Sequence, residues 1–171
     1  GNQVTFDGRE VHLTDVLLDQ PPAVVPPVVA GVRGPQSMAV AGRVADGVVP
    51  AEGANPTYLR RVKEQAGNPR DFRISVFSSM CIEDDRRTAY TWMAPVIAGW
   101  LSGPSPAMDA HTHADELRER FASGGEAALV DMPAEWWTEL GAIGTFDDAL
   151  AHISALTEAG AHDISMFPAP E

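Results

Sequence analysis

Apolar and polar residues alternate loosely over residues 4–18, which is the spacing of an extended chain rather than of a helix. Asp7 and Gly8 supply a turn signal inside this stretch, so we expect a short β-hairpin or an extended lead-in. Prolines at positions 21, 22, 26 and 27 follow, and because proline lacks an N–H and restricts the residue before it, they predict an extended connector. Residues 1–26 are therefore expected to lead into the first buried strand.

Beyond this lead-in, continuous apolar runs alternate with segments of helical spacing. Such runs are typical of parallel strands that are covered on both faces. They predict strands at residues 27–31, 48–50, 73–82 and 162–167. The 3.6-residue spacing predicts helices at about residues 37–45, 56–65, 84–101, 115–122, 133–140 and 146–159. Pro56 suits the first position of the second of these helices.

The order of these elements predicts an α/β fold built from parallel βα units with right-handed crossovers. Four strands are counted, whereas a closed TIM (β/α)₈ barrel needs eight, so we expect about half of such a barrel. Residues 102–131 are longer than a usual connection and are interpreted as an insertion. We expect residues 1–171 to form a single domain.

The composition narrows the possible partners and compartment. Asp and Glu outnumber Lys and Arg by 24 to 12, and a net charge of −12 argues against a nucleic-acid partner. The longest apolar runs, such as residues 23–32, are interrupted by proline and are too short to span a bilayer. Residues 1–7 are polar, so no signal peptide is expected. Cys81 is the one cysteine, and we expect a buried, inert thiol in a cytoplasmic protein without a membrane partner.

Several segments resemble one family, the luciferase-like flavin- and deazaflavin-dependent oxidoreductases. The end of one predicted helix, Ala41-Gly-Arg-Val-Ala-Asp-Gly47, resembles the Ala-Gly-Arg-x-Ala-Asp-Gly motif of that family. Residues 4–10, 82–89, 143–150 and 159–164 resemble its other elements. The resemblance covers nearly the whole chain and implies the second half of a luciferase-like barrel, equivalent to strands five to eight.

The same resemblance implies a cofactor site in the loop after the strand at 27–31. In the family, the backbone of this loop holds the cofactor phosphate, which is FMN or the deazaflavin coenzyme F-420. A helix N-terminus offers unpaired N–H groups to an anion, and glycine lets the anion approach closely. Pro35 removes one such N–H. The implied site residues are Val32, Arg33, Gly34, Gln36 and Ser37.

Three hypotheses for the function follow. The first is an oxidoreductase that acts on a small-molecule substrate, with no catalytic residue assigned because the family's first four strands would supply them. The second is a non-catalytic half-barrel module that forms a homo-oligomer or pairs with a complementary N-terminal half-barrel, because its sheet edges and one apolar face would otherwise be exposed. The third and weakest hypothesis is a Rossmann-type nucleotide-binding site, because residues 31–36 lack the third glycine of the Rossmann glycine motif.

The remaining candidate residues are given structural interpretations. His111 and His113 form a His-x-His pair without a third ligand and are interpreted as part of a solvated loop, so no metal site is expected. His152 and His162 have no nucleophile nearby, and surface or capping roles are expected for both. Asp46 is interpreted as a turn residue.

Overall fold

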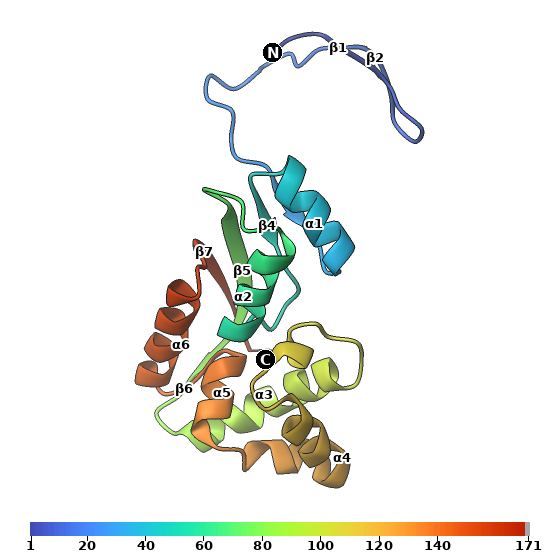
Figure 1. The fold of residues 1–171 in the computed structure, drawn as a ribbon. Coiled ribbons are helices and arrows are strands. Elements are labelled where there is room, and N and C mark those ends of the chain that lie inside the picture. Colours follow the sequence, from blue (N-terminus) through green and yellow to red (C-terminus); the bar gives the residue numbers. More distant parts are fainter. Residues whose placement is uncertain (170–171) are drawn as a thin grey trace.

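The computed structural model describes residues 1–169. Its first two strands form the predicted hairpin, in which β1 (Val4–Asp7) pairs antiparallel with β2 (His12–Val16). The Gly8 amide donates to the Val11 carbonyl at 2.9 Å and closes the turn. Figure 1 shows this hairpin apart from the rest of the molecule, joined to it by the proline-containing connector.

The remaining strands form one parallel sheet. They are β3 (Val29–Gly31), β4 (Gly47–Val49), β5 (Arg73–Ile82), β6 (Ala142–Gly144) and β7 (Asp163–Pro168). β3 pairs with β4, and β4 with the beginning of β5. β7 pairs with residues 75–80 of β5, and β6 with residues 80–82. The predicted α/β architecture of parallel βα units is therefore confirmed, with β5 contacting three other strands.

Helices connect these strands. They are α1 (Pro35–Val44), α2 (Pro56–Gln65), α3 (Arg86–Leu101), the short 3₁₀ helix η1 (Met108–Ala110), α4 (Ala114–Val130), α5 (Ala134–Leu140) and α6 (Phe146–Glu158). Local sequence fixes several of their starts. Pro56 occupies the first turn of α2 as predicted, and the side chain of Asn55 accepts the Tyr58 amide at 2.9 Å. Thr145 and Asp148 form a capping box at the start of α6.

The two faces of the sheet differ in their cover. Ile74 and Val76 of β5 are 1% exposed because they pack into the core beneath the helices. Phe77, which points to the opposite face, is 45% exposed. Its ring lies 6.4 Å from that of Phe167, a neighbour on β7. One face is thus buried, whereas the other carries exposed apolar side chains.

One sequence prediction is incomplete, because the strand β6 was not expected: its three residues are too few to show an alternating pattern. The predicted short helix at residues 115–122 corresponds to the first part of α4. Gly125 there has non-helical backbone angles, φ 61° and ψ −150°, and it separates this part from a second helical segment that reaches Val130.

Candidate functional site

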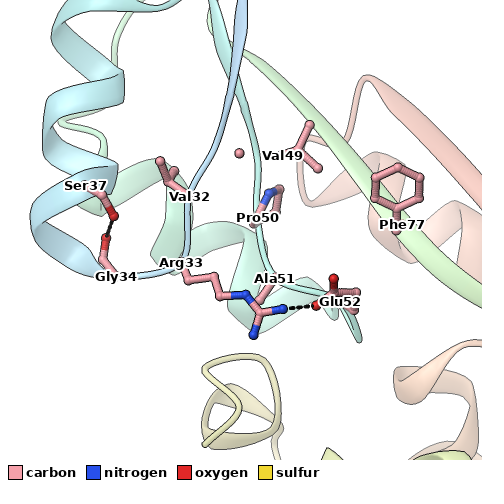
Figure 2. Close-up of a pocket in the computed structure, with 10 residues that line it drawn as sticks. Val32, Arg33, Gly34, Ser37, Val49, Pro50, Ala51, Glu52 and Phe77 are labelled. Atoms are coloured by element: carbon pink, nitrogen blue, oxygen red, sulfur yellow. Dashed lines mark hydrogen bonds and ion pairs between the residues drawn. The ribbon is translucent and has the colours of Figure 1, made fainter. Parts of the chain in front are cut away.

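A cavity of about 510 Å³ lies where β3 and β4 end. Two loops line it, one following each strand, and β5 contributes one aromatic side chain (Figure 2). Because β3 and β4 are parallel, their C-terminal ends meet at one edge of the sheet, which is where sites form in folds of this kind. The lining residues are Gly31, Val32, Arg33, Gly34, Ser37, Val49, Pro50, Ala51, Glu52 and Phe77.

The first loop is short because α1 begins almost directly after β3. Gly34 is the N-cap residue with extended backbone angles, and Pro35 follows at a position where a missing N–H costs no helical hydrogen bond. The Met38 amide donates to the Gly34 carbonyl at 2.9 Å, and so does the Ser37 hydroxyl. These bonds fix the loop against the first turn of the helix.

This helix start presents hydrogen-bond donors to the cavity. Within residues 1–169, the backbone N–H groups of Gln36 and Ser37 have no acceptor, as expected for the first turn of a helix. No atom lies within 3.9 Å of the place that a Cβ on Gly34 would occupy, and the nearest atom is the Ser37 hydroxyl oxygen. The backbone here is therefore open to a bound group, and the helix end favours a negative one.

The second loop adds a carboxylate. Arg33 reaches across the cavity mouth to Glu52, and its Nη2 lies 2.5 Å from the Glu52 Oε2 (Figure 2). Both side chains remain about half exposed, at 61% and 51%. Tyr58 lies beneath this loop, where burial raises the pKa of its phenol, and its hydroxyl contacts the Ala51 amide at 3.4 Å.

Four of the five sequence-predicted site residues come together here. Val32, Arg33, Gly34 and Ser37 all line the cavity, whereas Gln36 lies in the first turn of α1 and contributes no lining surface. Sequence reasoning missed the loop after β4, including Glu52, as well as Phe77. The signal for that loop was present, because residues 51–55 follow a predicted strand parallel to the one before it.

The donor set suits a phosphate ester. The free Ser37 amide and the Arg33 guanidinium line the cavity, and such groups bind phosphate oxygens in proteins. The open position at Gly34 leaves room for such an anion to reach the backbone. Glu52 is the one lining group that opposes an anion. The residues of this cavity therefore fit the phosphate of FMN or coenzyme F-420.

Polar groups near the N-terminal end of the open sheet face form a separate cluster. Arg73 donates to both carboxylate oxygens of Asp163 at 3.0 Å, and Ser75 donates to the same carboxylate at 2.8 Å. The hydrogen bond from Ser75 and the pairing with Arg73 hold the pKa of Asp163 below its usual range. These groups join β5 to β7 at the end of the strands opposite the cavity.

One histidine prediction is wrong and another is wrong in part. His152 is fully buried, so it has no surface role. Its Nε2 lies 2.8 Å from the Ser78 hydroxyl, and its Nδ1 lies 2.7 Å from the carbonyl of Thr138 in the last turn of α5, which is a capping contact. His111 is only 4% exposed, because α5 covers it, and it does not belong to a solvated loop. His113 stacks on Trp136 with the ring centres 4.5 Å apart.

The other interpreted residues have structural positions. His162 is exposed as expected, and its Nδ1 accepts the Ile74 amide at 3.2 Å. Cys81 is buried as predicted, and burial raises the pKa of its thiol. Asp46 lies at the junction of α1 and β4, and its carboxylate accepts the Val28 amide at 2.8 Å.

Residues 1–169 contain no cluster of three or more His, Cys, Asp or Glu side chains placed to hold a metal ion. None of the helices in that range combines the length and apolar character that crossing a membrane requires.

A family model and solved structures relate this chain to known proteins. The family model described as luciferase-like monooxygenase matches residues 1–163. The coenzyme F-420-dependent tetrahydromethanopterin reductase from Methanopyrus kandleri is similar in structure, with a TM-score of 0.67 and 19% identity, over 99% of this chain and 53% of that one. An F-420-dependent secondary alcohol dehydrogenase, in complex with an F-420–acetone adduct, is also similar in structure, with a TM-score of 0.66 and 17% identity. The match covers 99% of this chain and 51% of that one. The chain thus spans about half the length of these proteins and has the fold of that half.

Proposed function

The chain belongs to the luciferase-like monooxygenase family, and on this basis we propose that it supplies the phosphate-binding part of the cofactor site in a flavin- or deazaflavin-dependent oxidoreductase. One observation carries the proposal. The loop after β3 brings an open glycine, the free amide and the hydroxyl of Ser37, and the Arg33 guanidinium to one cavity. The two similar structures named above are of F-420-dependent proteins, which supports a cofactor of this class.

Each lining residue has a stated role in this proposal. The Ser37 amide would bind a phosphate oxygen, as would the Ser37 hydroxyl on turning away from the Gly34 carbonyl, and Arg33 would add a charge-assisted hydrogen bond. FMN or coenzyme F-420, when bound, supplies a ring that accepts or donates a hydride. The protein's contribution from this chain is to bind and orient the phosphate end. The substrate is proposed to be a small molecule.

We also propose a partner for the open sheet face. Phe77 remains 45% exposed on β5, whose other face is buried, and Val29 remains 37% exposed on the edge strand β3. A complementary half-barrel, or a second copy of this chain, would cover these side chains and pair the edge. The same exposure favours the second candidate function, a non-catalytic module that works by assembly. We place the protein in the cytoplasm, without a nucleic-acid or membrane partner, as its charge and single cysteine suggest.

The test is a fluorescence titration of the chain with FMN and, separately, with coenzyme F-420, while mass photometry follows its assembly. We expect saturable binding that weakens about tenfold in Arg33→Ala and in Ser37→Ala, because each change removes a hydrogen bond to phosphate. Arg60→Ala is the control, because Arg60 is an exposed arginine on α2 outside the cavity.

Three results would count against these proposals. Equal affinities in Arg33→Ala, Ser37→Ala and Arg60→Ala would place the cofactor elsewhere. A stable oligomer that binds neither cofactor would favour the assembly module over the oxidoreductase. A stable monomer at micromolar concentration would contradict a second copy as the partner of the sheet face.

A further inference from the structure

The two loops that line the cavity at the ends of β3 and β4 are held in different ways. The loop after β3 is short, and hydrogen bonds to the first turn of α1 fix it locally. The loop after β4, residues 50–55, packs instead against a segment that lies about 50 residues later in the chain. That segment is the beginning of the insertion at residues 102–131 and includes η1. The second wall of the cavity therefore rests on the insertion.

Asn55 connects this loop to the insertion. Its side chain is fully buried. The Nδ2 atom donates to the carbonyl of Ala107, just before η1, at 2.8 Å, and the Oδ1 atom accepts the Tyr58 amide at 2.9 Å. Within residues 1–169, the bond to Ala107 is the one hydrogen bond that joins residues 50–55 to residues 102–131. One side chain thus caps the start of α2 and also attaches the loop to the insertion.

Close packing surrounds this hydrogen bond. Gly53 has φ +78°, and a Cβ there would lie 3.2 Å from side-chain atoms of Met108 and Trp100. Met108 is fully buried in η1. Ala107 is fully buried as well, so water is kept from replacing the Asn55 donor. The insertion therefore supports the loop by packing, and the Asn55 bond fixes where the loop lies.

The same loop forms a wall of the cavity. Pro50, Ala51 and Glu52 all line it, a few residues before Asn55 (Figure 2). Movement of the loop away from the insertion would change the width of the cavity opposite the start of α1. A site that is binding-competent in only part of the population loses affinity in proportion to that part. We propose that Asn55 is a positioning residue, through which the insertion holds the second wall of the cavity in the geometry that binds the cofactor.

This inference rests on the proposed function, because it concerns how tightly the proposed cofactor is held. It also gives the insertion a role. Residues 102–131, all of which the structure describes, contribute no lining surface to this cavity. They therefore act on a bound cofactor only through the loop that they support.

The test separates this role from the capping of α2. Asn55→Ser and Asn55→Asp both keep an oxygen that can accept the Tyr58 amide, but serine is shorter and aspartate has no donor for the Ala107 carbonyl. Each whole chain is titrated with FMN and, separately, with coenzyme F-420. Amide hydrogen exchange of residues 51–55 is followed by mass spectrometry. We expect the dissociation constant to rise about fivefold and this exchange to become about tenfold faster in both variants.

Asp85→Ala is the control for a general loss of stability. Asp85 lies outside the cavity and accepts the Thr88 amide at 2.9 Å, so this change removes the N-cap of α3. It should leave both the dissociation constant and the exchange of residues 51–55 unchanged.

The outcomes separate this inference from the function on which it rests. If the wild-type chain binds a cofactor and both Asn55 variants keep its affinity, the insertion does not position the wall, and the proposed function stands. The same holds if Asp85→Ala weakens binding as much as the Asn55 variants do. If the wild-type chain binds neither cofactor, the proposed function is wrong and the positioning role of Asn55 fails with it.

Discussion

The carboxylate of Asp148 gives the clearest quantitative prediction for this fold. Its side chain is only 10% exposed at the start of α6, and Arg86 binds it through two hydrogen bonds of 2.8 and 2.9 Å. The backbone amide and hydroxyl of Thr145 each donate to it at 2.8 Å. Arg86 first, and then the Thr145 donors, hold the pKa of Asp148 at about 2, below its ordinary value of 3.8.

This lowered pKa corresponds to a contribution to stability. Each pKa unit is worth about 1.36 kcal/mol, so the ionised Asp148 stabilises the folded chain by roughly 2 kcal/mol. Because the folded pKa is the lower one, this contribution is complete above pH 4. It is lost as the pH falls from about 4 to about 2, where the folded carboxyl also takes up a proton.

Asp148→Asn tests this reasoning, because it removes the charge and keeps the shape of the side chain. Urea unfolding between pH 7 and pH 2 should give a free energy of unfolding about 2 kcal/mol below wild type at pH 7, and the difference should shrink toward pH 2. Asp147→Asn is the matched control, because Asp147 is the exposed acidic neighbour in the same turn. A difference that stays constant over this pH range would refute the assignment to the ionised carboxylate.

Two further predictions concern the core and the helix contacts. Burial lowers the pKa of His152, so the free energy of unfolding should fall as the pH drops below about 6.5, where the unfolded chain takes up the proton first. Urea titrations at pH 8 and pH 5 should show this loss in wild type and not in His152→Gln, and parallel pH dependence of both proteins would contradict it. Gly42→Ala should destabilise the chain by about 2 kcal/mol or more, because its Cβ would lie 1.9 Å from the Ala66 carbonyl oxygen. Gly99→Ala, at an open helical position, should stabilise by about 0.5 kcal/mol, and equal shifts of the two melting temperatures would rule out the predicted clash.

The sequence predicted the elements whose signals are local. β3 and β4 have only three residues each, but both were predictable from their surroundings. Prolines precede β3, a loop follows β4, and a helix of regular apolar spacing lies between the two strands. The start of α2 was visible from Pro56. The helix start directly after β3 was visible in the order of the elements, whereas the binding of a cofactor phosphate by the loop between them stays a prediction.

The missed features depend on contacts between distant residues. β6 becomes a strand only because the end of β5 is available to pair with it. His152 is buried because Ser78, 74 residues earlier in the chain, and Thr138 satisfy both of its ring nitrogens. Glu52 lies at the site because it forms an ion pair with Arg33, which belongs to a different loop. Patterns along the chain show none of these pairings directly.

β5 pairs with three strands at successive positions along its length, and this arrangement affects how the sheet opens locally. β7 can detach from residues 75–80 while the bonds between β3, β4 and β5 persist, whereas opening of β5 separates every strand pair of the parallel sheet except β3–β4. Amide hydrogens in the centre of β5 should therefore exchange with solvent only when the whole sheet opens. Those of β7 and β6 should exchange through smaller fluctuations, which makes β5 the slowest-exchanging segment of the chain.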